Sequence, residues 1–402
     1  MKTILVLTPR FPYPAIGGDR LRIYQICKSL SENFSLTLLS LCETEAEMAY
    51  QIPNDGVFDE VHRVRLPKWR SWINCMFHLV SKTPLQVAYY KSGKFATMAR
   101  ELGKKNDAYF AHLIRTADMV KDMPGVKFLE MTDAISLNYD RVRSSRSNSG
   151  WDYRKLVYKI ESNRLSDYER RIVTRFDHSF LVSAVDRDFL FSNLECHPVS
   201  VATNGVDTTS LPYGFISESS DIAFIGNMLS MQNLDAAQFI AEDILPHIRR
   251  RIPQARLRLI GRISEKHQAR LSSFDGVIVT GEVSNVSDAA KGCAVGVCPV
   301  RLGAGVQNKV LEYMALGLPT VSTSVGLEGF AAQPDRELLV ADEAEAFADQ
   351  VVRLIHDREL AEGIAIAGRR YVEDRHSWQA VLQPINHVIR QSLVDADPSH
   401  VS

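Results

Sequence analysis

The chain has 402 residues, of which 45% are apolar and 24% are charged, as in folded globular proteins. This length exceeds one ordinary hydrophobic core and predicts two domains. The formal net charge of −1 gives no reason to expect a nucleic-acid partner.

The cysteines and the apolar runs indicate in which cellular compartment the protein resides. The six cysteines include no CxxC pair, and residues 1–7 form an apolar run too short for a signal peptide. No stretch reaches the roughly 18 apolar residues of a membrane-spanning helix. We therefore expect a reducing, cytoplasmic location.

Positive charge is concentrated in the first half of the chain. Residues 61–105 hold ten lysines and arginines against one acid, whereas residues 331–375 hold eleven acids against six basic residues. We therefore expect an anionic partner to lie against residues 61–105, with the inner face of the cell membrane as one such partner.

In chain order, the first half alternates short apolar runs, typical of buried strands, with residues at helical spacing. The expected strands are residues 4–7, 35–41, 61–66, 108–113, 127–131, 177–182 and 198–202, and the expected helices are residues 20–30, 68–82, 151–175 and 188–194. Strands that alternate with helices predict a parallel sheet.

The loop at residues 8–19 ends in Gly17 and Gly18. It lacks the third glycine of a dinucleotide fingerprint, so a nicotinamide or flavin site is not expected. The two glycines either only let the chain turn or form a ligand-facing loop at the carboxyl ends of the strands.

The helix expected at residues 68–82 places Trp69, Trp72 and Met76 on one face. Basic residues lie on both sides of it in the sequence. Such a helix either lies in a membrane interface or packs its apolar face on its own sheet.

Several polar residues directly follow predicted strands. His112 is a candidate catalytic residue or a hydrogen-bonded structural one, and Asp133 is either a cleft carboxylate or the cap of the next helix. Asp186 and Asp188 look like a carboxylate pair for a metal, but their place at the start of a helix favours capping.

The second half follows a polar segment at residues 208–220, which predicts the interdomain linker. The expected strands are then residues 222–225, 257–260, 277–279, 294–300, 320–323 and 338–341, and the expected helices are residues 234–250, 306–316, 344–356, 359–375 and 377–394. Three strands are followed by glycines, Gly226, Gly261 and Gly281, so several ligand-facing turns are expected at one edge of one sheet.

Residues 299–323 are the most informative segment. The chain leaves a strand, passes Gly303 and Gly305, and enters a helix that Gly317 can close and that Pro319 cannot continue. Free N–H groups at such a helix N-terminus, with the positive end of the helix dipole behind them, suit a phosphate.

Charged residues accompany this glycine loop. Arg301 and Lys309 flank it, and Glu312 lies three residues beyond Lys309 on roughly the same helix face. Two cations, free N–H groups and a carboxylate fit a diphosphate with an attached ribose, although Glu312 by itself is equally a solvated surface acid. The Walker motif GxxxxGK[ST] is missing, which argues against a nucleoside triphosphatase.

The run Pro-x-Arg-x-Gly-x-Gly-x-x-x-Lys-x-Leu-Glu-x-Met-Ala-x-Gly-x-Pro-x-Val at residues 299–321 resembles the donor-binding signature of family 4 GT-B glycosyltransferases (glycosyl transferases group 1). Weaker similarities occur at the Gly17-Gly18 pair and at residues 183–187, 204–207 and 224–228. Together they resemble a subgroup of sugar transferases found with bacterial exopolysaccharide and protein-sorting systems.

This resemblance implies an α/β fold of two Rossmann-like parallel-sheet domains that face a central cleft. The first would comprise residues 1–207 and the last helix, about 377–394, which crosses back to it. The second would comprise residues 208–376 and bind the donor.

The resemblance also implies transfer of a hexosyl or related sugar, with retention, from a nucleoside-diphosphate sugar to a glycan, lipid-linked or other acceptor held by the first domain. No metal or other cofactor is implied. Arg301 and Lys309 would bind the diphosphate, Glu312 the ribose, and the turn from Gly281 to Val283 the base. The remaining donor-site residues are Gly226, Asn227, Arg262, Gly303 and Gly305, and Gly17 and Gly18 belong to the acceptor loop. Arg301 and Lys309 are also expected to act in catalysis, with His112 and Asp133 as further candidates because they directly follow predicted strands.

Three positions depart from the family pattern. Ala304 stands where members often have the first of two glutamates, and Asn227 and Asn233 stand where an arginine and a lysine are common. A missing cation weakens stabilisation of the leaving group, unless Arg262 or Arg301 substitutes. Two alternatives therefore stay open: a noncatalytic sugar-nucleotide-binding or scaffold protein of a glycan assembly system, and a sugar-nucleotide epimerase.

Overall fold

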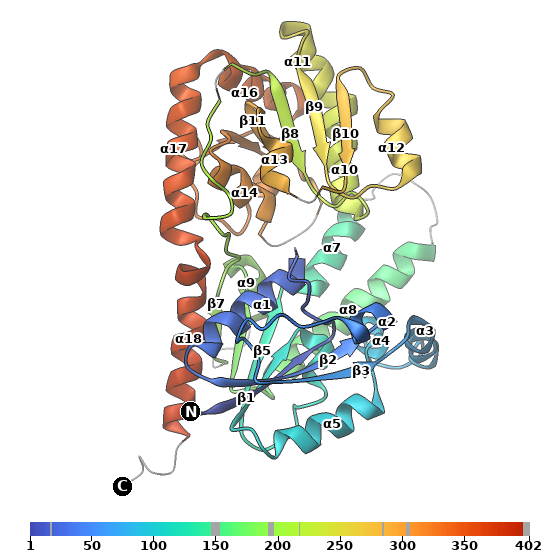
Figure 1. Ribbon diagram of the computed structural model, residues 1–402. Helices are drawn as coiled ribbons and strands as arrows, with labels where there is room; N and C mark the ends of the chain where they lie inside the picture. Colours follow the sequence, from blue (N-terminus) through green and yellow to red (C-terminus); the bar gives the residue numbers. More distant parts are fainter. Residues whose placement is uncertain are drawn as a thin grey trace. The chain divides into compact units, whose positions relative to one another are not determined.

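The computed structural model describes residues 1–16, 18–145, 153–191, 197–216, 218–283, 285–302 and 306–396. The chain divides into two compact units. Unit 1 comprises Met1–Thr203 and Leu382–Ser402, and unit 2 comprises Asn204–Val381. Each unit is an α/β structure built on a parallel sheet (Figure 1).

Unit 1 has, in its described residues, a seven-stranded sheet of order β3-β2-β1-β4-β5-β6-β7. Its strands are β1 Thr3–Thr8, β2 Ser35–Cys42, β3 Glu60–Arg65, β4 Ala108–His112, β5 Val126–Thr132, β6 His178–Leu181 and β7 Val199–Val201. Its helices are α1 Gly18–Ser31, α2 Glu45–Ala49, α3 Lys68–Phe77, α4 Leu85–Tyr89, α5 Gly93–Gly103, α6 Ile114–Ala117, α7 Ile135–Ser145, α8 Tyr153–Val173 and α9 Ala184–Phe191.

Unit 2 has, over the part of it that is described, a six-stranded sheet of order β10-β9-β8-β11-β12-β13. Its strands are β8 Asp221–Ile225, β9 Arg256–Ile260, β10 Val277–Gly281, β11 Val295–Cys298, β12 Thr320–Ser322 and β13 Leu339–Val340. Its helices are α10 Met231–Phe239, η1 Ile240–Ile244, α11 Leu245–Arg251, α12 Glu265–Leu271, α13 Val286–Ala290, α14 Asn308–Leu316, α15 Ser324–Leu327, α16 Ala344–His356 and α17 Arg358–Arg375.

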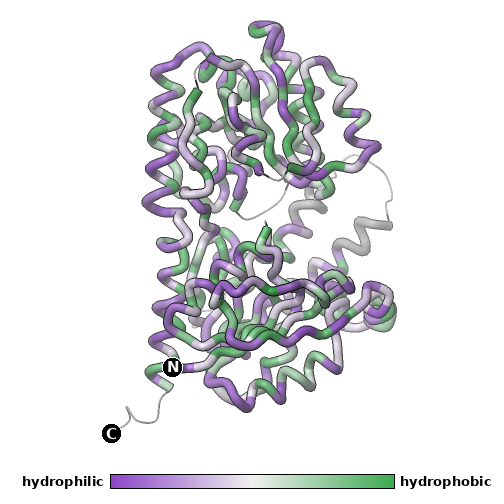
Figure 2. Tube along the Cα trace, viewed as in Figure 1, coloured by the Kyte–Doolittle hydropathy of each residue, from purple (hydrophilic) through white to green (hydrophobic). Residues whose placement is uncertain are grey.

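The strand predictions are confirmed to within two residues at each end. The reason is burial on both faces, which makes strands of a parallel sheet continuous apolar runs. In β1, for example, Ile4, Leu5, Val6 and Leu7 are fully buried, and Figure 2 shows hydrophobic residues along the strands of both sheets. All described strand pairs are parallel, as expected.

Two helix predictions in unit 1 were wrong in extent. The helix expected at residues 68–82 ends at Phe77. The N–H of His78 donates to the carbonyl of Cys75, and the His78 ring bonds through Nδ1 to the carbonyl of Asn74, which the next helical N–H would otherwise take. The tryptophans of this helix are exposed, so packing of this face on its own sheet was also wrong. The helix expected at residues 188–194 begins at Ala184 instead, and Ser183 accepts a hydrogen bond from the N–H of Asp186.

The helix expected at residues 234–250 has a wider turn in its middle. It runs through α10, the π-helical η1 and α11 without a break in the chain. The wide turn comes directly before Pro246, which has no N–H to donate to the preceding turn. Sequence periodicity does not reveal such a shift, because apolar residues continue through it.

The last helix, α18 Trp378–Asp395, begins in unit 2 and continues into unit 1. In unit 1, the Asn386 side-chain amide donates to Ser29 Oγ at 2.7 Å and Arg390 donates to Asn33 Oδ1 at 2.8 Å. Its second part is therefore fixed on the C-terminal end of α1. None of the helices in the described residues is both long and apolar enough to cross a membrane.

Arg369 of α17 fixes the segment that precedes β8, residues 208–211, to the rest of unit 2. Its guanidinium donates to the carbonyls of Thr208, Leu211 and Ala315. Ala315 lies in the last turn of α14, where unpaired carbonyls and the negative end of the helix dipole favour a cation. One partly buried arginine thus fixes both the entry to unit 2 and the end of α14.

We expect Arg369→Met to lower the free energy of unfolding by about 2 kcal/mol, because hydrogen bonds from a charged donor are lost while the aliphatic stem stays. Urea unfolding followed by circular dichroism measures the change. The exposed neighbour Arg370 supplies the matched control, Arg370→Met. Equal losses in the two variants would contradict this role of Arg369.

Candidate functional site

The N-terminus of α14 lies at the carboxyl edge of the sheet in unit 2, beyond β11. Gln307 is its N-cap residue and makes no side-chain capping bond. Gly317 ends the helix in the left-handed conformation with φ of 75°, as its position predicts. Gly303, Ala304 and Gly305 lie outside the described residues, so the expected glycine loop stays a prediction.

Lys309 sits in the first turn of α14 and is buried. Its ammonium donates to Asn233 Oδ1 at 2.8 Å and to Gln307 Oε1 at 3.1 Å, and it lies 5.5 Å from the centre of the Phe224 ring. Asn233 in turn donates to the carbonyl of Asn227 at 3.1 Å. Burial lowers the pKa of Lys309, because a charged form loses solvation inside the protein.

Glu312 follows one turn later and is not the fully solvated surface acid that its sequence position allows. Although part of its surface is exposed, burial raises the pKa of Glu312 to about 7 against the opposing effect of Lys309. A carboxyl group that titrates near neutral pH changes its charge under ordinary conditions. It accepts hydrogen bonds best when ionised.

Arg301 lies three residues after the end of β11 and forms an ion pair. Its guanidinium donates to both carboxylate oxygens of Asp235 on α10, at 2.9 and 3.2 Å, and stacks on the Phe239 ring with its central carbon 4.1 Å from the ring centre. The side chain is still about half exposed. Arg301 therefore stands at the expected edge of the sheet, in a fixed orientation.

Glycines bring the turns after β8 and β9 close together. Gly261 has φ of 132°, and a Cβ there would lie 2.2 Å from the carbonyl oxygen of Gly226. A Cβ on Gly226 would press against the Asn233 side chain. Gly261 therefore needs glycine, both for its conformation and for this contact, whereas a side chain at Gly226 would only require the Asn233 side chain to shift by a few tenths of an ångström.

Arg262 and the turn from Gly281 to Val283, both expected in the donor site, also lie at the carboxyl edge of the sheet in unit 2. Arg262 follows Gly261 and forms an ion pair with Glu282, and both side chains are exposed. Gly281 ends β10 with φ of 73°, and Val283 packs partly against the core. The turns after β8, β9, β10 and β11 therefore meet along one edge, as parallel pairing requires.

Unit 1 carries a buried charged group at the carboxyl ends of β4 and β5. Glu130 is fully buried and accepts hydrogen bonds from Arg22 Nε at 2.8 Å and from His112 Nδ1 at 2.7 Å. Arg22 also donates to the carbonyls of Ala202 and Thr203. Burial alone would raise the pKa of Glu130, but Arg22 and His112 outweigh it and lower this pKa to about 2.

The second ring nitrogen of His112, Nε2, is buried and makes no hydrogen bond within the described residues. Leu113 and Thr132, next to His112 and Asp133, have φ of 62° and 63°, which is unfavourable for residues with a side chain. Such strain clusters at functional sites, so these strand ends are a candidate site rather than only a structural ion pair.

Asp133 does not cap the helix that follows it. Asp186 accepts from the N–H of Ala134 at 2.9 Å, and Glu169 accepts from the N–H of Ile135 at 2.8 Å. No side chain or backbone group of the described residues donates a hydrogen bond to Asp133. Burial, and then the nearby charge of Asp186, raise the pKa of Asp133 to about 7.

The expectation that Asp186 and Asp188 cap a helix also needs correction. Asp186 is buried and supports the start of α7 through Ala134, whereas Asp188 is exposed and pairs with Arg187. The two carboxylates therefore have separate partners.

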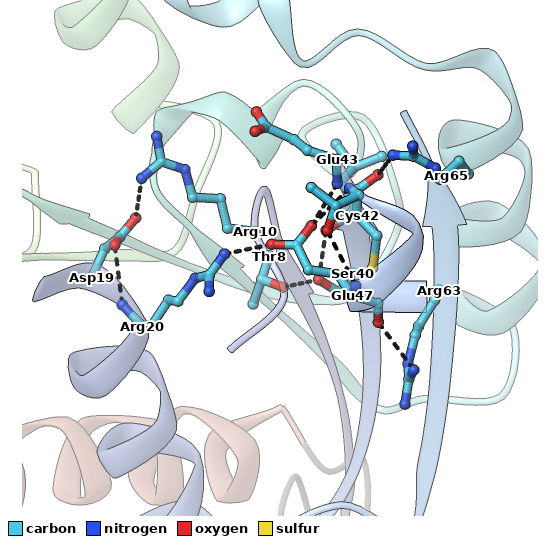
Figure 3. A network of polar contacts seen from close by, with 12 residues as sticks. Thr8, Arg10, Asp19, Arg20, Ser40, Cys42, Glu43, Glu47, Arg63 and Arg65 are labelled. Carbon is cyan, nitrogen blue, oxygen red and sulfur yellow. Dashed lines mark hydrogen bonds and ion pairs between the residues drawn. The ribbon is translucent and has the colours of Figure 1, made fainter. Parts of the chain in front are cut away.

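The loop after β1 is held at both ends. Arg10 pairs with Asp19 at 3.4 Å, and Arg20 pairs with Glu47 of α2 (Figure 3). Gly18 opens α1 with φ of 56°, where a side chain would be strained. Gly17 lies outside the described residues.

Sequence reasoning missed several residues of these two groups. Glu130 carried a signal, because a carboxylate inside a buried strand needs a cationic partner. Arg22 occupies a buried position of α1 and is that partner. Tyr313, whose hydroxyl accepts from the N–H of Ile225 and donates to the carbonyl of Val297, had no such signal because a tyrosine in an apolar helix reads as core.

Two sequence comparisons relate this chain to known proteins. Residues 219–357 match the model of the family Glycosyl transferases group 1. A 44.6 kDa protein from the cps region of Klebsiella pneumoniae is 22% identical over 403 residues, covering 96% of this chain and 99% of that protein.

Solved structures give the fold. Sucrose-phosphate synthase from Thermosynechococcus elongatus superposes with a TM-score of 0.73 at 13% identity, covering 98% of this chain and 100% of that one. HepE from Anabaena, in complex with UDP and glucose, superposes with a TM-score of 0.67 at 13% identity, covering 97% and 100%. The chain therefore has the GT-B fold, and its residues 219–357 match the Glycosyl transferases group 1 model.

Proposed function

We propose that this protein transfers a hexosyl or related sugar from a nucleoside-diphosphate sugar to a glycan or lipid-linked acceptor, with retention at the anomeric carbon. The observation that carries the proposal is the buried Lys309 in the first turn of α14, held by Asn233 and followed by Glu312. A buried cation at a helix N-terminus suits a diphosphate.

The relatives support the choice of substrate class. HepE was solved with UDP and with UDP-glucose, and the Klebsiella relative comes from a cps region. Polysaccharide or glycoconjugate synthesis on the cytoplasmic face of the membrane is the proposed setting. The basic residues 61–105 would contact the membrane there.

Unit 2 would bind the donor. Lys309 would hold the diphosphate and Glu312 the ribose hydroxyls, while Gly226, Asn227 and the turn from Gly281 to Val283 would approach the nucleoside through backbone groups. We propose that Arg301 and Arg262 exchange their partners Asp235 and Glu282 for the diphosphate, and so supply the further positive charge that Asn227 and Asn233 cannot. The reaction would need no metal ion, because these cations would neutralise the leaving diphosphate.

Unit 1 would bind the acceptor. Asp133, with a pKa of about 7, would receive the proton of the attacking hydroxyl, since a general base works best with a pKa near the working pH. His112 would accept a hydrogen bond from a sugar hydroxyl through Nε2. Glu130 and Arg22 would orient its ring, and Gly17 and Gly18 would line the acceptor loop.

The first experiment is a thermal-shift panel of UDP, GDP, dTDP and ADP sugars, because a ligand of the native state raises its stability. Release of nucleoside diphosphate is then measured with and without a lipid-linked sugar acceptor, in the presence of a chelator. Binding without turnover would favour a noncatalytic sugar-nucleotide-binding protein. Interconversion of the donor sugar without acceptor would favour an epimerase.

Lys309→Ala is expected to lower acceptor-dependent release of nucleoside diphosphate by about 100-fold or more, as loss of a donor to the developing charge does elsewhere. The matched control is Lys266→Ala, an exposed lysine of α12 in the same unit. Thermal unfolding shows whether each variant is folded. Unchanged turnover in a folded Lys309→Ala protein would show that the diphosphate binds elsewhere.

Glu312 should make donor binding depend on pH. The pKa of Glu312 is about 7, so the carboxylate is ionised at about pH 8 and mostly protonated at about pH 6. We expect UDP to bind about tenfold tighter than 2′,3′-dideoxy-UDP at the higher pH, with a smaller difference at the lower pH. Calorimetric titration measures both.

In Glu312→Gln, the preference for UDP over the dideoxy ligand should be small and the same at both pH values. The dideoxy ligand corrects for titration of the phosphates, which both ligands share. If wild type bound the two ligands equally at about pH 8, the assignment of the ribose to Glu312 would fail.

Asp133→Asn is expected to lower kcat by about 100-fold while the KM for the donor changes little. In wild type, kcat at saturating donor should rise as pH passes through about 7, the pKa of Asp133, because only the ionised form accepts a proton. The variant should lose this rise. Asp188→Asn, an exposed carboxylate of unit 1, is the control and should behave as wild type.

A further inference from the structure

The segment formed by α3 and the turn after it exposes an unusual amount of apolar surface. Among the described residues, seventeen large hydrophobic side chains are exposed, and seven of them lie within residues 69–80. Phe77 is 78% exposed and Val80 is 96% exposed. We call this the α3 patch, formed by Trp69, Trp72, Ile73, Met76, Phe77, Leu79 and Val80.

A positively charged hollow lies beside the α3 patch. Its volume is about 560 Å³, and its charged lining consists of two carboxylates and five cations, Lys82, Lys91, Lys121, Arg171 and Arg175. Lys121 pairs with Asp118 at 2.7 Å, and Arg175 pairs with Asp122. Over the described part of the chain, the other three cations form no ion pair, so the hollow has excess positive charge.

The patch and the hollow form one surface. Lys82 lines the hollow and follows Val80 by only two residues. The ammonium of Lys91 lies 3.1 Å from His78 Nε2, and Asn74 of α3 donates to the Lys91 carbonyl at 2.9 Å. These contacts keep the apolar side chains and the cations side by side.

Helix α8 fixes the turn that joins the patch to the hollow. Arg164 donates to the carbonyl of Leu79, and Glu161 accepts from the N–H of Leu85 at 2.8 Å. Arg164 and Glu161 are themselves paired at 2.7 Å. The apolar side chains of the turn are thus held in their exposed positions by the rest of unit 1.

We propose that this surface docks on a bilayer of anionic phospholipid, with the α3 patch in the headgroup region and a lipid phosphate in the hollow. Tryptophan and phenylalanine favour the interface between water and hydrocarbon, and lysine and arginine are attracted to anionic headgroups. A purely apolar partner would leave the unpaired cations unused, and a soluble anion would leave the patch exposed. The inference rests on the proposed function in that the membrane presents the lipid-linked acceptor.

Flotation of the full chain tests this with vesicles of phosphatidylcholine, alone or mixed equally with phosphatidylglycerol. We expect binding to the mixed vesicles to be about tenfold stronger. Lys82→Gln with Arg171→Gln should remove most of this preference, whereas Trp72→Ala with Phe77→Ala should weaken binding to both vesicles. Lys82, Arg171, Trp72 and Phe77 are all exposed, so each double variant should fold.

The control exchanges an exposed lysine and an exposed arginine of unit 2, Lys266→Gln with Arg358→Gln, and should bind as wild type. The proposal is overturned if wild type does not bind the mixed vesicles, if the Lys82 and Arg171 variant keeps the preference, or if the control loses as much. It is also overturned if inorganic phosphate raises the unfolding temperature through Arg171 while no vesicle is bound.

A thermal shift with UDP, without vesicles, keeps the two proposals apart. If vesicles bind and UDP does not, the donor assignment fails and the docking surface stands. If UDP binds and vesicles do not, the docking surface fails alone.

Discussion

Parallel strand pairing is the constraint on which the rest of the structure depends. Because every described strand in a unit points the same way, every turn that follows a strand lies at the same edge. In unit 2 this brings the turns after β8, β9, β10 and β11 together, although they are far apart in sequence. In unit 1 it sets the ends of β4 and β5 side by side, where His112 and Glu130 meet. Parallel pairing alone is therefore enough to bring the polar residues that follow different strands to one edge of each sheet.

The cations at the edge of unit 2 differ in their partners. Arg301 and Arg262 are each balanced by a carboxylate, Asp235 and Glu282. Lys309 instead bonds to neutral amide oxygens, so its charge is oriented without being neutralised. An asparagine at position 233 therefore has a role that a lysine could not fill, because a second cation would repel Lys309. Asn233 thus adds no charge of its own, but it fixes the position of the charge on Lys309.

Much of the fold was predictable, because burial on both faces of a parallel sheet leaves long apolar runs in the sequence. The strands and the end of α14 at Gly317 follow from such local signals. Short helices such as α2 and α4 were not predicted. Helix α2 has no buried residue and begins with a capping box of Thr44 and Glu47, which apolar periodicity does not show. At the end of α3, the His78 ring takes the carbonyl of Asn74 from the helix, which apolar spacing does not show.

The site was predictable for residues that carry a motif and not for their partners. Lys309 and Glu312 could be placed from the pattern of residues 299–321, but not the raised pKa of Glu312, which comes from packing around it. Arg22 and Glu130 were missed for the same reason. They are separated by more than one hundred residues and meet only in the folded unit. A buried charge in an apolar strand signals that a partner exists without saying which residue it is.

The orientation of His112 has a consequence for the chemistry that unit 1 can select. When the imidazole is neutral and its Nδ1–H faces the Glu130 carboxylate, Nε2 carries a lone pair and no proton. The group that meets this nitrogen must therefore bring a hydrogen, as an alcohol does and as a carbonyl or phosphate oxygen does not. Glu130 thereby sets the direction of a hydrogen bond that it does not itself make. The buried carboxylate thus decides whether a hydrogen-bond donor or an acceptor can bind at Nε2 of His112.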